Sequence, residues 1–395
     1  MAMFSTFLFS ARMYVQLCAQ SLSRRGDLGR LSLAGRLLRL LVFMAFFPVW
    51  LIHWVGLLLD EVLFRGYRNV EVRQPVFILG VPRSGTTFLH RTLAADTDTF
   101  TTLSTWEVFF APSVTQRMFW RGIGRLDGLL GSPFKRLLQW AEARLFKGLE
   151  GVHEVSLEAA EEDYLLLLPI LSCFILFLPF TESPYIWRLS RFDWDMPAQD
   201  RRRIMDFYKA CLQKHLYFHG AQRRFLSKNA SFASWTNSLH EQFPDASFVI
   251  CLREPEKAVP SLIGSLESGA RLFELDLDRG ELPQMLIAMM RDFYRHLLTE
   301  IRPRAPLVHM ADLQSQLEPT VVGIYQDVGI PMSDTYLTCL RRLADEAGRY
   351  RSKANHITPK TVAQDQYFVH NFPWYYELAG SVTPTNHLPQ SKPKA

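Results

Sequence analysis

Residues that could bind a phosphate group follow an apolar run near residue 76. The stretch Val76–His90 reads VFILGVPRSGTTFLH, in which Gly80 and Gly85 fit the GxxxxG frame of a phosphate loop between a strand and a helix. Backbone N–H groups of such a loop, and the N-terminus of the helix that follows it, bind anions. Three hydroxyl side chains could add hydrogen bonds to the same anion: Ser84, Thr86 and Thr87.

The cationic side chain of this loop does not occupy the position that it has in nucleoside triphosphatases. Those loops have lysine directly after the second glycine, where this chain has Thr86. Arg83 lies inside the loop instead, where its guanidinium group could contact the bridging oxygen of a bound phosphoanhydride. No acidic magnesium-binding motif is evident beside the loop. We therefore expect an anion site without a metal ion.

A second anion-binding pattern occupies Phe243–Ser261, FPDASFVICLREPEKAVPS. An apolar run ends at Arg253, and a helix is expected to open near Pro255 and to carry Ser261. The serine follows the arginine by eight residues, or about two helical turns, so both side chains can reach one dianion at the edge of a sheet. The alternative is structural: Arg253 caps neighbouring carbonyl groups, and Ser261 lies on a helix surface.

The two patterns together resemble the sulfotransferases that use PAPS (3′-phosphoadenylyl sulfate). PRSGTT after a strand is similar to the family's 5′-phosphosulfate loop, and Arg253 with Ser261 is similar to its 3′-phosphate motif. The resemblance covers roughly residues 74–380. It implies a P-loop-like α/β fold, PAPS as co-substrate and transfer of a sulfonate group to a hydroxyl group. The residues that it implies for PAPS binding are Arg83, Ser84, Gly85, Thr86, Thr87, Arg253 and Ser261.

Lys228 ends the segment Arg224–Lys228, RFLSK, which we expect to be another short strand. The family commonly has a lysine at this place, near the transferring sulfonate. Relatives often place a histidine shortly after this lysine, whereas residues 229–232 read NASF here. The resemblance therefore implies that Arg83 and Lys228 stabilise the leaving group, and that the general base comes from elsewhere.

Glu107 is the first candidate for the base that deprotonates the acceptor hydroxyl. It follows Arg83 by 24 residues, and sulfotransferases that act on tyrosine and carbohydrate look similar in placing a catalytic glutamate downstream of this loop. Its apolar sequence neighbours, Trp106 and Val108 among them, predict a pKa raised by desolvation. The alternative for Glu107 is a helix cap or an ion-pair partner.

His153 is the second candidate for the base, although a lone histidine is more often a structural residue. Three clustered acids, Glu161, Glu162 and Asp163, are too close together to act as one base. We expect them to organise the site or to form a solvated helix face.

The N-terminal part of the chain differs in composition from the rest. Leu37–Leu59 is apolar apart from Arg39 and His53 and is long enough to cross a bilayer. Residues 1–75 hold nine arginines against four acidic residues and so account for the whole net charge of +5. The rest of the chain is therefore neutral overall, and the charge distribution does not indicate a nucleic-acid surface. Pro48 would bend a helix here, so a hairpin or an in-plane helix is an alternative to a single span. We expect residues 37–59 to associate with a membrane; a buried pair of core helices is the alternative.

The remainder alternates apolar strands with helical patterns, which predicts an α/β domain with a mainly parallel sheet flanked by helices. Three runs are expected strands: Val76–Leu79, Phe248–Leu252 and Leu307–Met310. We divide the chain into a basic hydrophobic segment (1–72), a sulfotransferase domain (73–380) and a disordered tail (381–395). Five cysteines without metal-ligand spacing predict neither a zinc site nor a disulfide framework.

The acceptor is the least defined part of this prediction. Leu165–Phe180 is unusually apolar and contains two prolines, which fits a buried helix or the wall of a groove for an acyl or isoprenoid chain. With the apolar N-terminus it favours an amphiphilic acceptor, a lipid or glycolipid alcohol, or else a carbohydrate. Two other interpretations are a P-loop kinase, which needs magnesium and a loop lysine, and a non-catalytic nucleotide-binding membrane scaffold. The catalytic domain is expected in the cytoplasm of a bacterium or, in a eukaryote, in the Golgi lumen.

Overall fold

The computed structural model of the protein describes residues 2–22, 32–134, 136–137, 140, 157–277, 281–347 and 367–381. Its centre is a five-stranded sheet with the order β2-β3-β1-β4-β5, in which all paired strands run parallel. The strands are β1 (Val76–Gly80), β2 (Phe100–Thr101), β3 (Arg224–Lys228), β4 (Ser247–Leu252) and β5 (Leu307–His309). The expected strands are confirmed as β1, β4 and β5, the short strand expected at Arg224–Lys228 is confirmed as β3, and the α/β fold with a mainly parallel sheet is confirmed as well.

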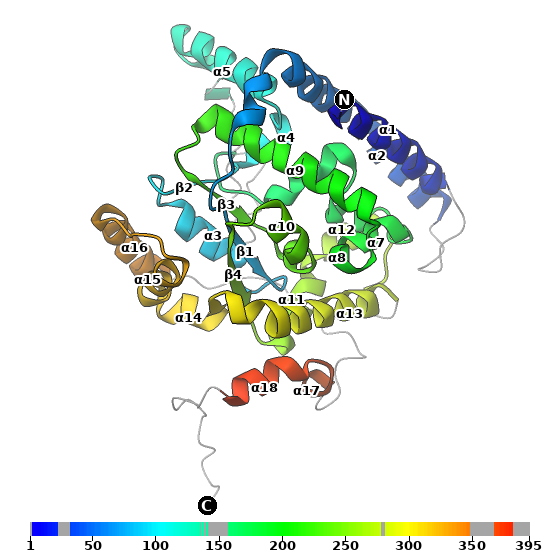
Figure 1. Cartoon of the computed structure of the whole chain (residues 1–395). Coiled ribbons are helices and arrows are strands. Elements are labelled where there is room, and N and C mark those ends of the chain that lie inside the picture. Colours follow the sequence, from blue (N-terminus) through cyan, green and yellow to red (C-terminus); the bar gives the residue numbers. More distant parts are fainter. Residues whose placement is uncertain are drawn as a thin grey trace, which may run out of the picture.

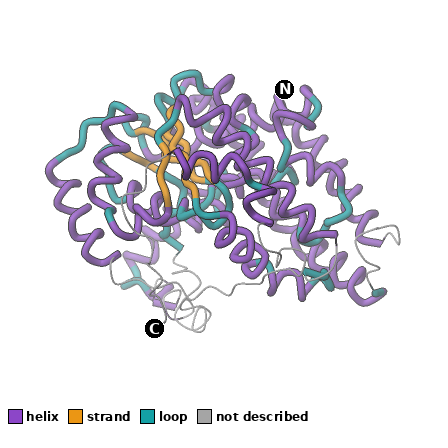
Figure 2. Tube along the Cα trace, turned by 90° about the horizontal axis from the view of Figure 1, so that it is seen from below, coloured by secondary structure: helices purple, strands orange, loops and turns teal. Residues whose placement is uncertain are grey.

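Helices cover both faces of this sheet, as Figures 1 and 2 show. One face packs on α3, α14, α15 and α16, and the other packs on α9, α10, α11 and α13. The helices after β1 are α3 (Thr86–Ala94), α4 (Thr105–Phe110), α5 (Val114–Leu129), α7 (Pro184–Leu189), α8 (Phe192–Asp195), α9 (Ala198–His219), α10 (Thr236–Gln242), α11 (Pro255–Ser265), α12 (Glu267–Leu272), α13 (Glu281–His296), α14 (Met310–Ser315), α15 (Leu317–Val328), α16 (Asp334–Ala347), α17 (Tyr367–Asn371) and α18 (Pro373–Ser381).

The side chains of β1 explain why both faces must be covered. Val76 and Ile78 belong to the core on the α3 side, whereas Phe77 and Leu79 belong to the core on the α9 side. Successive side chains of a strand point to opposite faces, so a continuous apolar run is typical of a strand buried on both faces. The carboxyl ends of the parallel strands meet at one edge of the sheet, and all the predicted anion-binding residues follow those ends.

Two N-terminal helices, α1 (Ala2–Leu22) and α2 (Leu33–Leu63), lie side by side along the outside of the domain (Figure 1). By length and composition, α2 is the one helix among the described residues that could cross a membrane. One face of α2 is nevertheless part of the main core, where Trp50, Trp54 and Leu57 are buried. The pair α1 and α2, which we call the N-terminal hairpin, therefore shares a core with residues beyond 72.

The apolar run Leu165–Phe180 lies beneath this hairpin. It forms two short 3-10 helices, η2 (Asp163–Ile170) and η3 (Phe174–Phe177), where the sequence suggested either one buried helix or a groove wall. The indole N–H groups of Trp50 and Trp54 both donate to the carbonyl oxygen of Pro169, each over 2.9 Å. Most side chains of this run are buried in the main core. The run therefore matches the buried alternative, and the alternative of a groove wall for a lipid chain is not what the structure has.

Candidate active site

The phosphate loop lies between β1 and α3 and is packed too tightly for side chains at its two glycines. A Cβ atom on Gly80 would lie 2.5 Å from the carbonyl oxygen of Cys251, the β4 residue with which Gly80 pairs. A Cβ atom on Gly85 would lie 2.4 Å from the sulfur of Met310, and the φ of Gly85 is +90°. The GxxxxG spacing is therefore required by contacts with β4 and α14, and it points the N-terminus of α3 toward the carboxyl edge of the sheet.

The hydroxyl residues of the loop differ in what they can offer to an anion. Ser84 is fully buried, and its Oγ atom donates to the carbonyl oxygen of Val81 over 2.7 Å, so this side chain braces the loop. Thr86 is buried at the first turn of α3, whereas Thr87 is half-buried. Arg83 has a φ of +70°, an uncommon conformation for a residue other than glycine, and its side chain reaches Ser261 of α11.

Arg83, Arg253 and Ser261 come together, although they lie far apart in the sequence. Arg83 Nε donates to Ser261 Oγ over 3.1 Å, and Arg253 Nη1 donates to the carbonyl oxygen of Arg83 over 3.2 Å. The carbonyl oxygen of Arg253 accepts from the hydroxyl of Tyr294 over 2.5 Å, which ties the end of β4 to α13. Two guanidinium groups and the start of α3 thus converge on one place, an arrangement that could hold a ligand with several negative charges.

Lys228 ends β3, beside β1, and its side chain is only 3% exposed. Its ammonium group contacts the carboxylate of Glu162, which is 29% exposed and precedes η2. Burial lowers the pKa of His90, on α3, to about 3, and the positive charge of Lys228 adds to this effect. Lys228 therefore lies within electrostatic range of the helix that starts at the phosphate loop.

Glu107 has partners at both carboxylate oxygens. Its Oε2 accepts from the backbone N–H and the hydroxyl of Ser104, over 3.0 and 2.9 Å, in a capping box at the start of α4. Its Oε1 lies 2.5 Å from His219 Nε2 and 3.5 Å from Arg117 Nη1. The side chain is 2% exposed.

The environment of Glu107 corrects the prediction that its pKa is raised. Burial favours the neutral acid, but the charge of Arg117 and the hydrogen bond from His219 outweigh it, so the pKa of Glu107 lies well below its usual range. A strongly acidic carboxylate with both oxygens engaged is a weak proton acceptor at neutral pH. The geometry matches the structural alternative, a helix cap and ion-pair partner. The other candidate base, His153, lies outside the described residues.

Three residues around Glu107 were not expected from the sequence: Arg117, His215 and His219. The ligand atoms of Glu107 and the two histidines lie within 4.8 Å of one another, a spacing that a metal ion could use. However, Arg117 Nη1 lies 3.3 Å from His215 Nδ1 as well as 3.5 Å from Glu107 Oε1, so the guanidinium group already provides the cation of this cluster. The sequence signal was the four-residue spacing of the histidines on α9, which places them on one helix face.

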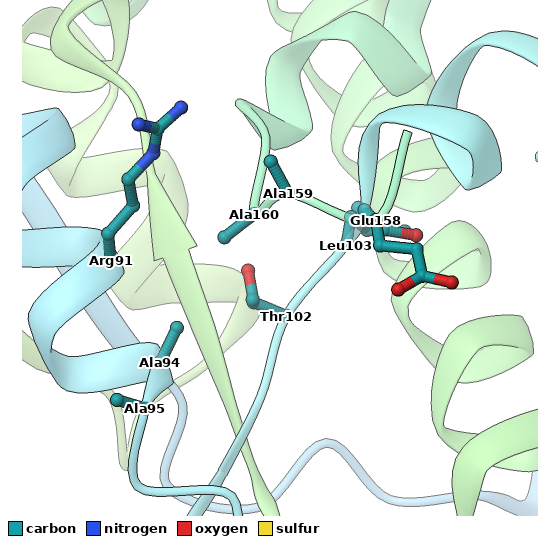
Figure 3. A pocket seen from close by; sticks show the side chains of 9 residues that line it. Arg91, Ala94, Ala95, Thr102, Leu103, Glu158, Ala159 and Ala160 are labelled. Atoms are coloured by element: carbon teal, nitrogen blue, oxygen red, sulfur yellow. The ribbon is translucent and has the colours of Figure 1, made fainter. Parts of the chain in front are cut away.

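An open pocket of about 370 Å³ lies next to this region, at the carboxyl end of β2 (Figure 3). Its described lining residues are Arg91, Ala94, Ala95, Thr102, Leu103, Ser104, Glu158, Ala159 and Ala160, and none of these belongs to the phosphate loop. Figure 3 shows the helix that bears Arg91 on one side of the pocket and the Glu158–Ala160 segment on the other. An antiparallel bridge joins Ser104 to Ala160, two residues before Glu162.

The strand order places these groups in a row along the carboxyl edge of the sheet. Arg253 follows β4, the phosphate loop follows β1, Lys228 ends β3, and the pocket adjoins β2. Lys228 and Glu162 therefore lie between the pair of arginines and the pocket. This order suits a reaction that joins an anionic donor to a second substrate.

Comparisons with known proteins agree with the fold. A sequence model described as the Sulfotransferase family matches residues 75–334, and the chain therefore belongs to the sulfotransferase family. Sulfotransferase STF9 from Mycobacterium avium superimposes with a TM-score of 0.66 at 16% identity, over 96% of each chain. Sulfotransferase STF1 from Mycobacterium tuberculosis H37Rv gives a TM-score of 0.57 at 18% identity, over 87% of this chain and 93% of its own. No curated protein matches the chain.

The superposition on STF9 covers so much of this chain that it extends into the N-terminal hairpin. The hairpin is thus part of the shared fold, although the family model begins only at residue 75. Family membership makes the protein a transferase that moves a sulfonate group, as the loop and the Arg253 motif suggested.

Proposed function

We propose that the protein transfers the sulfonate group of PAPS to a hydroxyl group of its acceptor. The observation that carries this proposal is the convergence of Arg83, Arg253 and Ser261 at the N-terminus of α3. A kinase would leave Arg253 and Ser261 without a task and would need a lysine at Thr86. Membership of the sulfotransferase family is a second, independent argument against the kinase alternative.

PAPS has two phosphate positions, and the chain offers a separate group of residues for each. Backbone N–H groups at Gly85, Thr86 and Thr87 would hold the 5′-phosphosulfate, with Ser84 bracing the loop from beneath. Arg253 and Ser261 would hold the 3′-phosphate, as the resemblance implies. Arg83 connects the two groups because it contacts both of those residues. The proposed donor site needs no metal ion.

The reaction requires one bond to form and one to break at sulfur. The acceptor oxygen attacks sulfur in line, the bond from sulfur to the bridging oxygen of the 5′-phosphate breaks, and adenosine 3′,5′-bisphosphate (PAP) leaves with that electron pair. Arg83 and Lys228 stabilise the negative charge that develops on the bridging oxygen. The acceptor proton must pass to a base.

Glu162 suits the role of base better than Glu107, which revises the expectation that the acidic cluster 161–163 only organises the site. Each of the three acids has a partner of its own: Thr105, Lys228 and Tyr208 respectively. Glu162 contacts Lys228, which we place at the transferring sulfonate, and it keeps 29% of its side chain exposed. Glu107 is 2% exposed and is held by Ser104 and His219. The pocket that ends at Ala160 would place an acceptor hydroxyl within reach of the Glu162 carboxylate.

The acceptor is proposed to be amphiphilic, a lipid or glycolipid alcohol, or a carbohydrate. The pocket combines four alanines and one leucine with the polar groups of Arg91, Thr102 and Glu158, which fits a ligand with both polar and apolar parts. We also propose that residues 37–59 bring the protein to a membrane. The catalytic domain would then face the cytoplasm in a bacterium, or the Golgi lumen in a eukaryote.

Calorimetric titration of PAP into the purified full chain, without magnesium, tests the donor assignment. Arg253→Ala should weaken binding by at least about 2 kcal/mol, because it removes a charge-assisted hydrogen bond to phosphate. Arg271→Ala is the matched control, since Arg271 is exposed on α12 and pairs with Glu267. Equal affinities of the folded wild type and Arg253→Ala, or no PAP binding at all, would refute the donor assignment and favour the scaffold alternative.

A further inference from the structure

Most of the exposed large apolar side chains in the described part of the chain lie on or next to three helices, α1, α2 and α5. Among the described residues, all but four of the large apolar side chains that are exposed belong to residues 4–63 and 109–140. Examples are Phe4 and Leu8 on α1, Ile52 and Val55 on α2, and Phe119 and Leu126 on α5, all more than half exposed. Exposed apolar area of this extent marks a surface that binds another body.

Helix α5 continues the surface of the hairpin. Gln116, in its first turn, is hydrogen-bonded to His53 of α2 over 2.9 Å, and Thr115 donates to Asp60 of α2. Figure 1 shows α5 extending beyond this end of the hairpin. We call the exposed faces of α1, α2 and α5 the three-helix surface.

The charges on the three-helix surface are of one sign. Arg12 on α1 and Arg121 and Arg125 on α5 are exposed, and the guanidinium group of Arg121 also packs on the ring of Phe218 of α9, 4.0 Å from its centroid. The acidic residues of these helices in the described part of the chain are Asp60, Glu61 and Asp127; two are buried, and Glu61 is paired with Arg68. Apolar side chains interspersed with arginines, without an exposed carboxylate among the described residues of these helices, complement the interface of an anionic phospholipid bilayer.

The contacts of α2 show how it can meet a bilayer. Arg39, near its start, is buried and contacts Glu182 over 2.6 Å, and Asp60, near its end, is fully buried against Lys214 of α9 over 2.8 Å. These two residues are separated by about 30 Å of helix. Trp50 and Trp54 bind Pro169 between them. The helix is thus fixed at its start, middle and end to one folded domain.

A helix held in this way cannot cross a bilayer without drawing the charged groups of that domain into the hydrocarbon. We propose that the three-helix surface lies in the plane of one leaflet of an anionic membrane, with the arginines among the phosphate headgroups and no segment crossing. The catalytic domain and both ends of α2 are then on the same side. This proposal rests on the membrane association proposed above but not on sulfonate transfer, which PAP binding tests separately.

The test uses the full chain, because removing residues 1–72 would uncover the core beneath the hairpin. Flotation with vesicles of phosphatidylcholine alone, or with added phosphatidylglycerol, should recover the wild type mainly with the anionic vesicles, and less of it at high salt. Ile52→Glu and Phe119→Glu should each lower the vesicle-bound fraction about tenfold. Leu272→Glu, on exposed α12, is the matched control and should bind as the wild type does.

Two further measurements keep the outcome decisive. Thermal unfolding and PAP titration show whether each variant is folded, and Arg121→Ser with Arg125→Ser provides a second pair if a glutamate variant does not fold. Leu33→Cys and Leu63→Cys are made one at a time in a chain without Cys18 and Cys339, so that the other cysteines of that chain are the buried Cys173, Cys211 and Cys251. Labelling with an impermeant maleimide in membrane vesicles then shows on which side of the membrane each position lies. Labelling of both positions from the same side supports the proposal.

Three results would overturn it. The first is labelling of positions 33 and 63 from opposite sides, which means that α2 crosses the membrane. The second is equal recovery of the wild type without vesicles and with them. The third is a dimer in solution that Ile52→Glu and Phe119→Glu abolish, with no vesicle binding, which means that a second copy covers the surface. PAP titration that is normal in each case would leave the proposed donor assignment intact.

Discussion

The Nε atom of Arg83 lies 3.1 Å from the hydroxyl oxygen of Ser261, although 178 positions of the chain separate the two residues. The guanidinium group of Arg253 donates a hydrogen bond to the backbone carbonyl oxygen of Arg83. The phosphate loop and the segment that leads from β4 into α11 therefore form one connected unit. A donor with phosphates at both ends of a ribose would link these elements further. Each element should therefore contribute to the affinity for PAP.

Ser261→Ala should weaken PAP binding by about 1.5–3 kcal/mol, the range for a hydrogen bond to a charged group. Calorimetry of the purified variant measures this loss directly. Ser265→Ala is the control, because Ser265 is exposed on the same helix and donates only to the carbonyl oxygen of Leu262. A similar change in both variants would show that the effect comes from α11 as a whole and not from the 3′-phosphate.

Gly85→Ala should abolish PAP binding and destabilise the fold by at least about 1–2 kcal/mol, the cost of a left-handed conformation for an L-residue. The added methyl group would also meet the sulfur of Met310 at 2.4 Å. Urea unfolding measures the stability, and titration measures the binding. A second variant with Met310→Ala should recover part of the stability, because it relieves the clash but leaves the backbone strain at a φ of +90°.

Gly323→Ala provides the comparison in the opposite direction. Gly323 lies inside α15, and no described atom within 4 Å would meet its Cβ. Alanine in an open helical position should stabilise the protein by about 0.5–1 kcal/mol and leave PAP binding unchanged. If both glycine variants behaved alike, the special geometry assigned to Gly85 would be wrong.

The phosphate loop could be predicted from the sequence because its determinants are local. A buried strand, two glycines at a fixed spacing and a helix follow one another within 15 residues, Val76–His90, and the contacts that exclude a Cβ atom are consequences of that arrangement. The strands β4 and β5 were found for the same reason. The two-residue strand β2 is too short for a periodic pattern to show.

The environment of Glu107 could not be predicted because distant elements determine it. Its sequence neighbours are apolar, yet the groups at its carboxylate are Arg117 from α5 and His219 from α9. The N-terminal helix gave a similar difficulty. Arg39 interrupts the apolar run of α2, and no partner for it could be read from the sequence; in the folded protein it pairs with Glu182, which is 143 positions away.

Glu162→Gln should lower kcat by about 10²-fold and leave PAP affinity close to that of the wild type, because the loss falls on proton transfer and not on donor binding. Lys228→Ala should lower kcat by about 10²–10³-fold, since it removes charge stabilisation from the leaving oxygen. Glu241→Gln, an exposed substitution on α10, is the control. Because these rates need an acceptor, the measurement follows an acceptor screen with sulfonate-labelled PAPS.

The pH dependence of kcat tests whether Glu162 is the general base. If Glu162 is the base, the pH profile of kcat for the wild type should have an acidic limb that Glu162→Gln removes. A profile that keeps its acidic limb in Glu162→Gln would assign the base elsewhere, with His153 as the next residue to replace.

Glu107→Gln should reduce stability rather than catalysis. Its folded-state pKa lies below the unfolded value, so its ionisation stabilises the fold above about pH 4.5, and this contribution is lost as the pH falls toward the folded-state pKa. At pH 7 the variant should lose about 3–5 kcal/mol, because Arg117 stays buried without its charged partner. Urea unfolding at pH 7 and pH 4 should show a smaller difference between the two conditions for the variant than for the wild type.

The double variant Glu107→Gln with Arg117→Met distinguishes a buried ion pair from a catalytic base. Removing both charges leaves no unpaired ion, so the double variant should be more stable than Glu107→Gln alone. Its kcat per folded molecule should stay within about tenfold of the wild type, because neither group is expected to touch the acceptor. A loss of about 10³-fold in kcat for Glu107→Gln, with stability unchanged, would instead return the base to Glu107, and the low pKa would then have to be relieved by acceptor binding.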